Sequence, residues 1–384
     1  MAFGLSFFDA LCGAFRALRR SRSVGNGARS RSPCMVPRRR TSPGWGGREM
    51  RTDTGRHPSD EASLLRVEGL QTWFPIRRGL MRRTTGWVQA ATDISFEIAP
   101  GRTLALVGES GCGKTTVGRS ILRLEAPQKG RVFFEGKDLM TLSRAEMRAA
   151  RQRIQIIFQD PMASLDPRMR VRDQIAEGMK SFGIGANDRE RDARVAELLE
   201  RVQLDPDTME RYPHEFSGGQ RQRICIARAL AVEPRMIVCD ESVSALDVSI
   251  QAQILNLLRD LQQDLGLSYL FITHDLSVVR YLAHEVAVMY LGEIVEEGPT
   301  RRIFESPAHP YTKGLLAAIP SIDPDHRGAA PPVLGDVPSP SDPPPGCHFH
   351  TRCPFVMDRC RKQAPPLFEI EGGRSRCFLS ESPA

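Results

Sequence analysis

The stretch GRTLALVGESGCGKTT, residues 101–116, places a glycine-rich loop between a short apolar run and a sequence typical of a helix. Residues 103–107 predict a buried strand, and Thr115 onward predicts the helix. Between them, Gly108, Gly113, Lys114 and Thr115 match the spacing of a phosphate-binding loop. Glycines let backbone N–H groups approach a triphosphate, with the positive end of the helix dipole behind them. Lys114 is expected to reach the β- and γ-phosphates, and the Thr115 hydroxyl to bind Mg²⁺.

Two later segments add chemistry to this loop. The apolar run MIVCDE, residues 236–241, ends in two carboxylates. Asp240 suits the coordination shell of Mg²⁺, and Glu241 suits a general base that polarises the attacking water. Residues 216–220, FSGGQ, lie shortly before this run and open the helical stretch RQRICIARALA. They therefore present a second helix N-terminus that can hold a phosphate.

The net charge of +7 is unevenly distributed along the 384 residues. Residues 1–60 hold twelve arginines against four acidic residues, so the remainder is close to neutral. This first stretch is rich in Arg, Ser, Gly and Pro and is expected to be a disordered tail. Met50 is a plausible alternative start, and we expect residues 1–49 to be idle or missing from the natural product. With the positive charge confined to this tail, a nucleic acid partner is not expected.

Six motifs follow one another along the chain: GESGCGKTT, IIFQDP, FSGGQRQR, MIVCDE, SALD and FITHD. In this order they resemble the ATP-binding subunit of an ABC transporter, over residues 64–380. The resemblance implies an α/β fold, a P-loop ABC-type nucleotide-binding domain with an antiparallel β subdomain and a helical subdomain, plus a C-terminal extension that contains cysteines. The expected division is a tail at 1–60, the ABC ATPase domain at 61–305 and the extension at 306–384.

The same resemblance assigns roles to single residues. Glu241, His274 and Gln159 are expected to be catalytic, and Thr115, Gln159 and Asp240 are expected to hold Mg²⁺. An aromatic residue should stack on adenine, and Phe74 is preferred to Trp73 for this role. Residues 244–247, SALD, match the D-loop. The residues expected to bind ATP are Phe74, Gly108, Ser110, Gly111, Gly113, Lys114, Thr115, Thr116, Gln159, Asp240, Ser217, Gly219 and Gln220.

The family pattern also predicts partners. The FSGGQ segment of one chain faces the phosphates of another, so the ATPase is expected to work as a pair. SPAHPYTKGLLAAIP, residues 306–320, resembles the oligopeptide/dipeptide branch of ABC importers and the second of its two unequal ATPases. This implies a different ATPase as dimer partner, two membrane permeases, an external solute-binding protein and a peripheral place on the cytoplasmic face of the inner membrane. The alternatives are uptake of nickel or glutathione and, with less support, a soluble ABC ATPase that acts on nucleic acid.

Four cysteines lie close together near the end of the chain, at Cys347, Cys353, Cys360 and Cys377. In a cytoplasmic protein this spacing favours a metal site over disulfides, and thiolates suit both Zn²⁺ and an iron–sulfur cluster. His348 and His350 are further possible zinc ligands. Similarity to the tails of peptide-importer ATPases favours a [4Fe–4S] cluster over zinc. We expect a structural role for it, with ATP binding near Lys114 unaffected.

Overall fold

The computed structural model describes residues 63–79, 83–244, 246–319 and 335–381. The predicted basic tail at residues 1–60 and the alternative start at Met50 lie outside these residues. Within them, no helix combines the length and the apolar character needed to cross a membrane.

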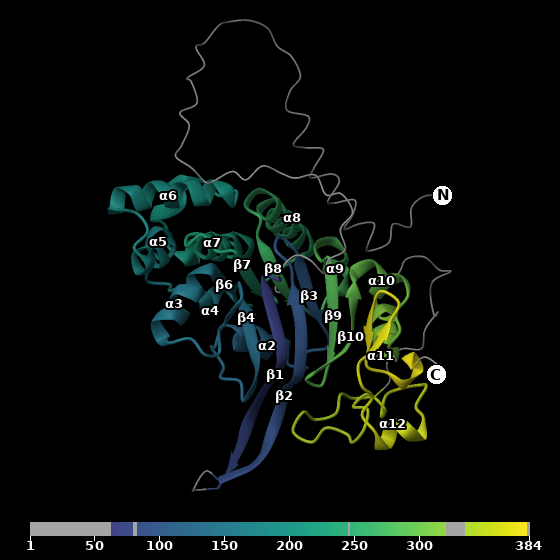
Figure 1. The fold of residues 1–384 in the computed structure, drawn as a ribbon. Coiled ribbons are helices and arrows are strands. Elements are labelled where there is room, and N and C mark those ends of the chain that lie inside the picture. Colours follow the sequence, from purple (N-terminus) through teal and green to yellow (C-terminus); the bar gives the residue numbers. More distant parts are fainter. Residues whose placement is uncertain (1–62, 80–82, 245, 320–334, 382–384) are drawn as a thin grey trace, which may run out of the picture.

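A large sheet forms the centre of the molecule (Figure 1). In spatial order its eight strands are β11 (Phe368–Ile370), β12 (Gly373–Ser375), β10 (Glu293–Pro299), β9 (Glu285–Tyr290), β3 (Thr103–Val107), β8 (Ser268–Thr273), β7 (Met236–Asp240) and β6 (Ile154–Ile157). Strands β9, β3, β8, β7 and β6 pair in parallel. Every residue of β3, β7 and β8 is buried, as expected for strands covered on both faces. Because these strands are parallel, the loops after β3, β7 and β8 leave from one edge of the sheet.

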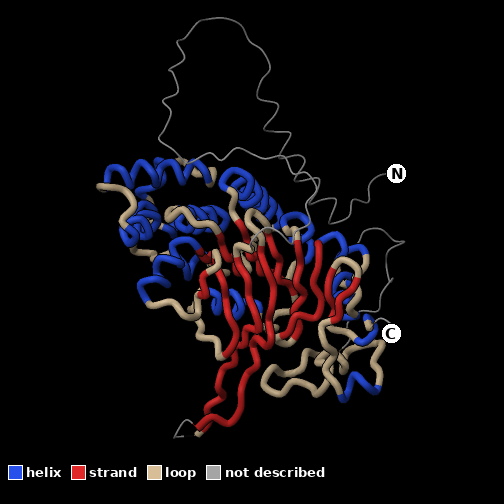
Figure 2. Tube along the Cα trace, in the orientation of Figure 1, coloured by secondary structure: helices blue, strands red, loops and turns tan. Residues whose placement is uncertain are grey.

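A second, antiparallel sheet has the order β2 (Arg83–Ile98), β1 (Leu65–Arg78), β4 (Lys129–Phe134) and β5 (Lys137–Asp138). Strands β1 and β2 are long and extend beyond their apolar residues. Pairing continues to Arg78 opposite Arg83, because backbone hydrogen bonds extend the ladder whatever the side chains are. Figure 2 shows the resulting hairpin projecting beyond the body of the molecule.

The helices fall into groups. Helix α2 (Lys114–Ile121) follows β3, and α3 (Arg144–Arg153) and α4 (Pro161–Ser164) flank β6. A helical part is built from α5 (Val171–Phe182), α6 (Asp188–Arg201) and α7 (Gly218–Leu230), with 3₁₀ turns at Pro206–Glu210 and Pro213–Glu215. The remaining helices are α8 (Val248–Leu265), α9 (Leu276–Leu282), α10 (Thr300–Glu305), α11 (Pro310–Ala317) and α12 (Asp358–Lys362), with a 3₁₀ turn at Phe378–Ser380. The predicted α/β fold with antiparallel and helical parts is confirmed.

The core packs against both faces of the large sheet. On one face, Leu106, Val238 and Ile272 pack with α2 and the antiparallel sheet. On the other, Ile237 and Phe271 pack with α5, α7 and α8. Neighbouring residues of a strand point to opposite faces, so the continuous apolar runs in the sequence supply both clusters. Each large apolar side chain buried in this way contributes about 1.5–3 kcal/mol. The packing fixes the sheet edge from which the motif loops emerge.

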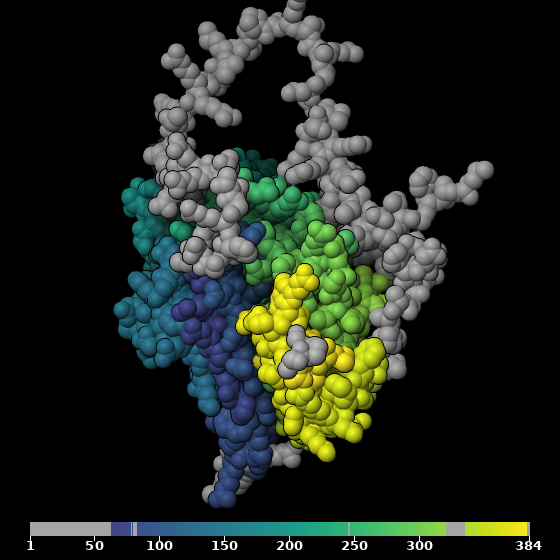
Figure 3. Space-filling model, turned by 45° about the vertical axis from the view of Figure 1, so that its right-hand side comes forward, coloured from purple at the N-terminus to yellow at the C-terminus, as the bar shows by residue number. Residues whose placement is uncertain are grey.

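The C-terminal extension joins the large sheet. Its strand β12 pairs with β10, and Glu296 on β10 is fully buried. The Glu296 carboxylate accepts hydrogen bonds from Arg302 and from the backbone N–H groups of Ala308 and His309, which begin the HPYT stretch. His309 then caps α11 by accepting from the N–H of Tyr311 at 3.1 Å. Figure 3 shows the extension lying against the β1–β2 hairpin.

Candidate functional site

The phosphate loop occupies residues 108–113, between β3 and the start of α2. Two of its glycines have no room for a side chain. A Cβ at Gly113 would lie 1.7 Å from the carbonyl oxygen of Ala90, and one at Gly108 would lie 2.2 Å from that of Met289. The buried Lys114 ammonium donates to the carbonyls of Gly108, at 2.8 Å, and Glu109, at 2.9 Å. The loop thus has the backbone shape and the cation that a triphosphate requires.

Two predicted Mg²⁺ ligands meet beside this loop. The hydroxyl of Thr115, at the start of α2, donates a 2.7 Å hydrogen bond to Oδ1 of Asp240, at the end of β7. Asp240 is buried, and this loss of solvent raises its carboxyl pKa, an effect that the Thr115 bond opposes. A carboxylate and a hydroxyl held side by side suit a hard cation that prefers oxygen ligands.

The three residues expected to be catalytic lie together, because Gln159 and His274 both approach one carboxylate oxygen of Glu241. Oε2 of Glu241 accepts a 2.9 Å hydrogen bond from the side-chain amide of Gln159 and lies 3.4 Å from Nδ1 of His274. Glu241 follows β7 and His274 follows β8, so the common sheet edge brings them together. The backbone of Glu241 has φ of 45°, a strained conformation for a residue other than glycine. Its N–H is held by the carbonyl of Ile272 at 3.0 Å.

The FSGGQ segment begins α7 in the helical part. Ser217 caps the helix, and its N–H donates in return to the side-chain oxygen of Gln220, at 2.9 Å. Both residues are exposed. Gly219 is buried against α8, where an added Cβ would lie 2.4 Å from Cγ2 of Ile250. The segment therefore presents its polar edge outward while its glycine allows close helix packing.

The adenine-stacking candidates point to different sides of β1. The Trp73 indole donates to Thr92 at 2.9 Å. Thr72 meets Ser120 of α2 at 2.9 Å, and Phe74 shares the Thr72 face because side chains alternate along a strand. Phe74 is therefore on the side of the phosphate-loop helix, and Trp73 is not. In the D-loop, Ser244 donates to the Glu241 carbonyl at 2.9 Å, and Ala245 lies outside the described residues.

The four tail cysteines all line one small apolar cavity, together with Phe349, Phe355 and Phe378. They are free thiols, and burial raises the thiol pKa of Cys347 to about 12 and of Cys377 to about 11. Within the described ranges, however, no three His, Cys, Asp or Glu side chains are arranged closely enough to hold a metal ion. His350 borders the cavity, whereas Nδ1 of His348 lies 3.6 Å from a Glu293 carboxylate oxygen.

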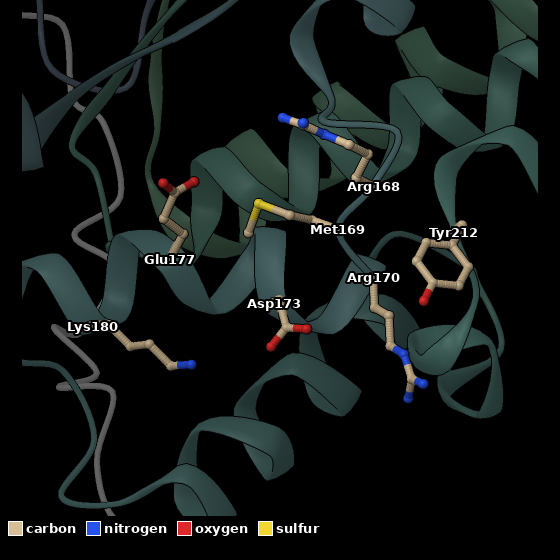
Figure 4. A pocket seen from close by; sticks show the side chains of 7 residues that line it. All are labelled: Arg168, Met169, Arg170, Asp173, Glu177, Lys180 and Tyr212. Atoms are coloured by element: carbon tan, nitrogen blue, oxygen red, sulfur yellow. The ribbon is translucent and has the colours of Figure 1, made fainter.

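A surface hollow of about 400 Å³ lies in the helical part, near the segment that follows Gln159. Its lining is mixed in charge (Figure 4), with the side chains of Arg168, Met169, Arg170, Asp173, Glu177, Lys180 and Tyr212. These side chains come from the segment that follows Gln159, from α5 and from Tyr212.

Comparison with known proteins places this geometry in a family. The profile described as "ABC transporter" matches residues 91–244, and that described as "Oligopeptide/dipeptide transporter, C-terminal region" matches residues 295–360. A peptide import ATP-binding protein of Brucella ovis is 51% identical over 322 residues, which cover 84% of this chain and 99% of the relative. The chain belongs to the ATP-binding subunits of ABC transporters, in their oligopeptide/dipeptide group. It is an ATPase whose hydrolysis of ATP, with Mg²⁺, is coupled to transport.

Other members of the ABC family show how far the likeness extends. The glutathione import ATP-binding protein GsiA of Escherichia coli O6:H1 is 55% identical over 277 residues, which cover 72% of this chain and 44% of that protein. Among solved structures, cbiO1 of the Clostridium perfringens ABC transporter complex cbiONQ has a TM-score of 0.55 at 28% identity, covering 64% of this chain and 92% of that one. A dimeric ATP-binding cassette, MJ0796 bound to ADP and Pi, has a TM-score of 0.56 at 26% identity, covering 62% and 99%.

Proposed function

We propose that this ABC ATPase energises the uptake of oligopeptides or dipeptides through a membrane permease. The observation that carries the catalytic part is the convergence of Gln159 and His274 on the Glu241 carboxylate, beside the Thr115–Asp240 pair. Support for the cargo comes from the match over residues 295–360 and from relatives named for peptide import. Glutathione is the second candidate, because GsiA is 55% identical over the ATPase region.

In this proposal each site residue has one task. Lys114 and the amides of residues 108–116 bind the phosphates, Phe74 stacks on adenine, and Mg²⁺ is held by Thr115, Gln159 and Asp240. Glu241 orients and deprotonates the attacking water, while His274 stabilises the γ-phosphate side of the site. Mg²⁺ supplies charge neutralisation on the transferring phosphoryl group when bound.

The proposed transporter contains a second ATPase subunit. Ser217 and Gln220 are exposed at the start of α7, which is a different element from the phosphate loop, so with the backbone of Gly219 they are proposed to meet the nucleotide of a partner chain. We infer a heterodimer with a related ATPase; pairing as such is supported by the dimeric structures of the cassette MJ0796, which has the same fold. The pair would sit on two permeases at the cytoplasmic face of the inner membrane, with a solute-binding protein outside. The hollow lined by Arg168 and Tyr212 is the proposed contact for a permease segment.

The extension at residues 306–384 is proposed as an addition to the ATPase domain at 61–305, in which Cys347, Cys353, Cys360 and Cys377 hold a [4Fe–4S] cluster. The proposal is supported by the soft donor set and by the one apolar cavity that the four thiols share, although within the described residues they do not lie close enough together to hold a metal ion. Iron and acid-labile sulfide should be present in anaerobically purified protein and absent from Cys353→Ala. Cys225→Ala in α7 is the matched control. Zinc without sulfide would support the alternative ligand, and a metal-free wild type would contradict both.

A pulldown from detergent-solubilised membranes tests the transport assignment. The Glu241→Gln chain with ATP is expected to recover two permeases and a different ABC ATPase, because a hydrolysis-deficient chain stays in its ATP-bound assembly. The associated solute-binding protein, tested for binding of oligopeptides and glutathione, identifies the cargo. Recovery of soluble nucleic-acid proteins without any membrane protein would contradict the proposal.

A further inference from the structure

The C-terminal extension reaches into the phosphate loop through one arginine. Nη1 and Nη2 of Arg352 donate to Oε2 and Oε1 of Glu109, at 2.7 and 3.0 Å. Arg352 is 9% exposed and immediately precedes Cys353, whereas Glu109 follows the first glycine of the loop. The two residues are separated by 243 positions. A bidentate pair of this kind fixes both the distance and the orientation of the two groups.

A second contact from the extension holds the same residue. The hydroxyl of Tyr311, on α11, accepts a 3.0 Å hydrogen bond from the backbone N–H of Glu109. The carbonyl of Glu109 accepts from Lys114 at 2.9 Å. The backbone and side chain of Glu109 are thus held from both sides, by Lys114 of the phosphate loop and by two residues of the extension.

Aromatic packing makes the contact between Arg352 and Glu109 rigid. The rings of Tyr311, Tyr290 and Phe349 form a buried cluster with centroid separations of 4.7, 5.3 and 5.4 Å. The Arg352 guanidinium lies over Tyr290, 5.8 Å from its ring centre. Phe349 and Arg352 both belong to the segment between Cys347 and Cys353. The turn that carries the cysteines is therefore anchored in the core beneath the ATP site.

We propose that Arg352 is a positioning residue of the ATP site, acting through Glu109, so that the cysteine-bearing segment forms part of the nucleotide-binding machinery. Glu109 introduces a negative charge into a loop whose task is to bind a highly charged anion. Arg352 neutralises that charge and holds the carboxylate turned toward the extension. The sequence predicted a structural role for the cysteine site, with ATP binding near Lys114 unaffected, whereas this proposal ties the segment beside the cysteines to the phosphate loop.

The direction in which each substitution changes the affinity for ATP follows from charge. In Arg352→Gln, Glu109 keeps its charge without its counterion and repels the triphosphate, so ATP binds more weakly. In the double variant Arg352→Gln/Glu109→Gln, no charge is left and binding returns. In Glu109→Gln, the positive charge of Arg352 remains near the phosphates and binding tightens. A purely structural clamp predicts a different pattern, in which each single variant breaks the same contact and weakens binding, and the double variant stays as weak as the single ones.

Equilibrium dialysis of the full chain with MgATP, in the Glu241→Gln background to prevent turnover, separates these possibilities. Arg352→Gln should raise the Kd about three- to tenfold, as expected for one partly screened charge near a triphosphate. The Kd of the double variant should return to within about twofold of the parent value, and Glu109→Gln should bind at least as tightly as the parent. The difference in Kd between Arg352→Gln and the parent should shrink in high salt. Arg359→Gln is the matched control, because Arg359 lies in the same extension but pairs with Glu381.

The outcomes distinguish this inference from the proposed ATP site on which it rests. A parent chain that binds no MgATP, or one whose binding survives Lys114→Ala, would overturn the site itself and the inference with it. If the parent binds MgATP but the Kd is unchanged in Arg352→Gln, the inference alone is overturned. The same holds if the double variant binds as weakly as the single one. If Arg352→Gln does not fold, as judged by its thermal transition, weaker binding by Glu109→Gln would refute the charge argument.

Discussion

The amide of Gln159 donates a 2.9 Å hydrogen bond to Oε2 of Glu241, although the residues are 82 positions apart. Gln159 also begins the segment that leads to Arg168 and Arg170, which line the surface hollow in Figure 4. The same residue therefore contacts the proposed general base and leads into the proposed permease contact. Movement at that surface has a direct covalent and hydrogen-bonded route to the site of hydrolysis.

Glu241→Gln should abolish turnover while leaving ATP binding intact. The amide has nearly the same shape as the carboxylate but cannot take a proton from water. We expect kcat to fall at least about 100-fold, the usual contribution of general-base catalysis. Phosphate release and equilibrium dialysis on the same preparation measure the two properties. Turnover at the parent rate would contradict the role of Glu241.

Phe74→Ala should weaken ATP binding, because it removes the aromatic ring on the phosphate-loop side of β1. Stacking of a base on an aromatic ring is worth about 1–3 kcal/mol, so the Kd should rise about tenfold. Trp73→Phe is the control, since it removes the hydrogen bond to Thr92 from the other side of the strand. If Trp73→Phe impairs ATP binding and Phe74→Ala does not, the assignment must be reversed.

Arg168→Glu should reduce the recovery of permease without affecting ATP binding. The Arg168 side chain is 88% exposed and borders the hollow, so reversing its charge alters the surface while the fold is retained. We expect at least about threefold less permease in a pulldown, as for a charge reversal at an interface rim. Arg189→Glu on α6 makes the same charge change outside the hollow and should have no effect. Equal losses in both variants would argue against this docking surface.

His284 should make the fold less stable in mild acid. Its Nδ1 accepts a 3.0 Å hydrogen bond from the N–H of Thr103, and burial together with the charge of Arg102 lowers its pKa below 6.5. As the pH falls below 6.5, the unfolded chain takes up this proton before the folded chain does, so stability declines. The loss between pH 7 and 5.5 is at most about 1 kcal/mol, because the ring is only partly buried.

His284→Asn provides the comparison, since a side-chain carbonyl can accept the Thr103 hydrogen bond without titrating. Urea unfolding at pH 7 and 5.5 should show a smaller decline for this variant than for the parent. An identical decline in the two proteins would assign the acid sensitivity to other groups.

The sequence by itself determined the local parts of this protein. The glycines of residues 108–113, the buried runs at 103–107 and 236–240, and the capping pattern of Ser217 and Gln220 each depend on neighbours a few residues away. The spacing of apolar residues and the residue types of turns encode such features directly. The order of the motifs was sufficient to identify the family. The ends of β1 and β2 have no such local marker, because cross-strand pairing carries both strands further than their apolar residues extend.

Only the tertiary structure decided which distant side chains meet. Thr115 reaches Asp240 and Gln159 reaches Glu241 because parallel strands deliver their loops to one edge of the sheet. The pairing of β12 with β10 and the packing of Phe349 bring Arg352 to Glu109 across 243 residues. No local pattern marks either partner of that pair, since an arginine in a tail and a glutamate in a loop are ordinary until the fold places them together. Such contacts arise from the packing of the whole chain, and so they could not be predicted from any one segment.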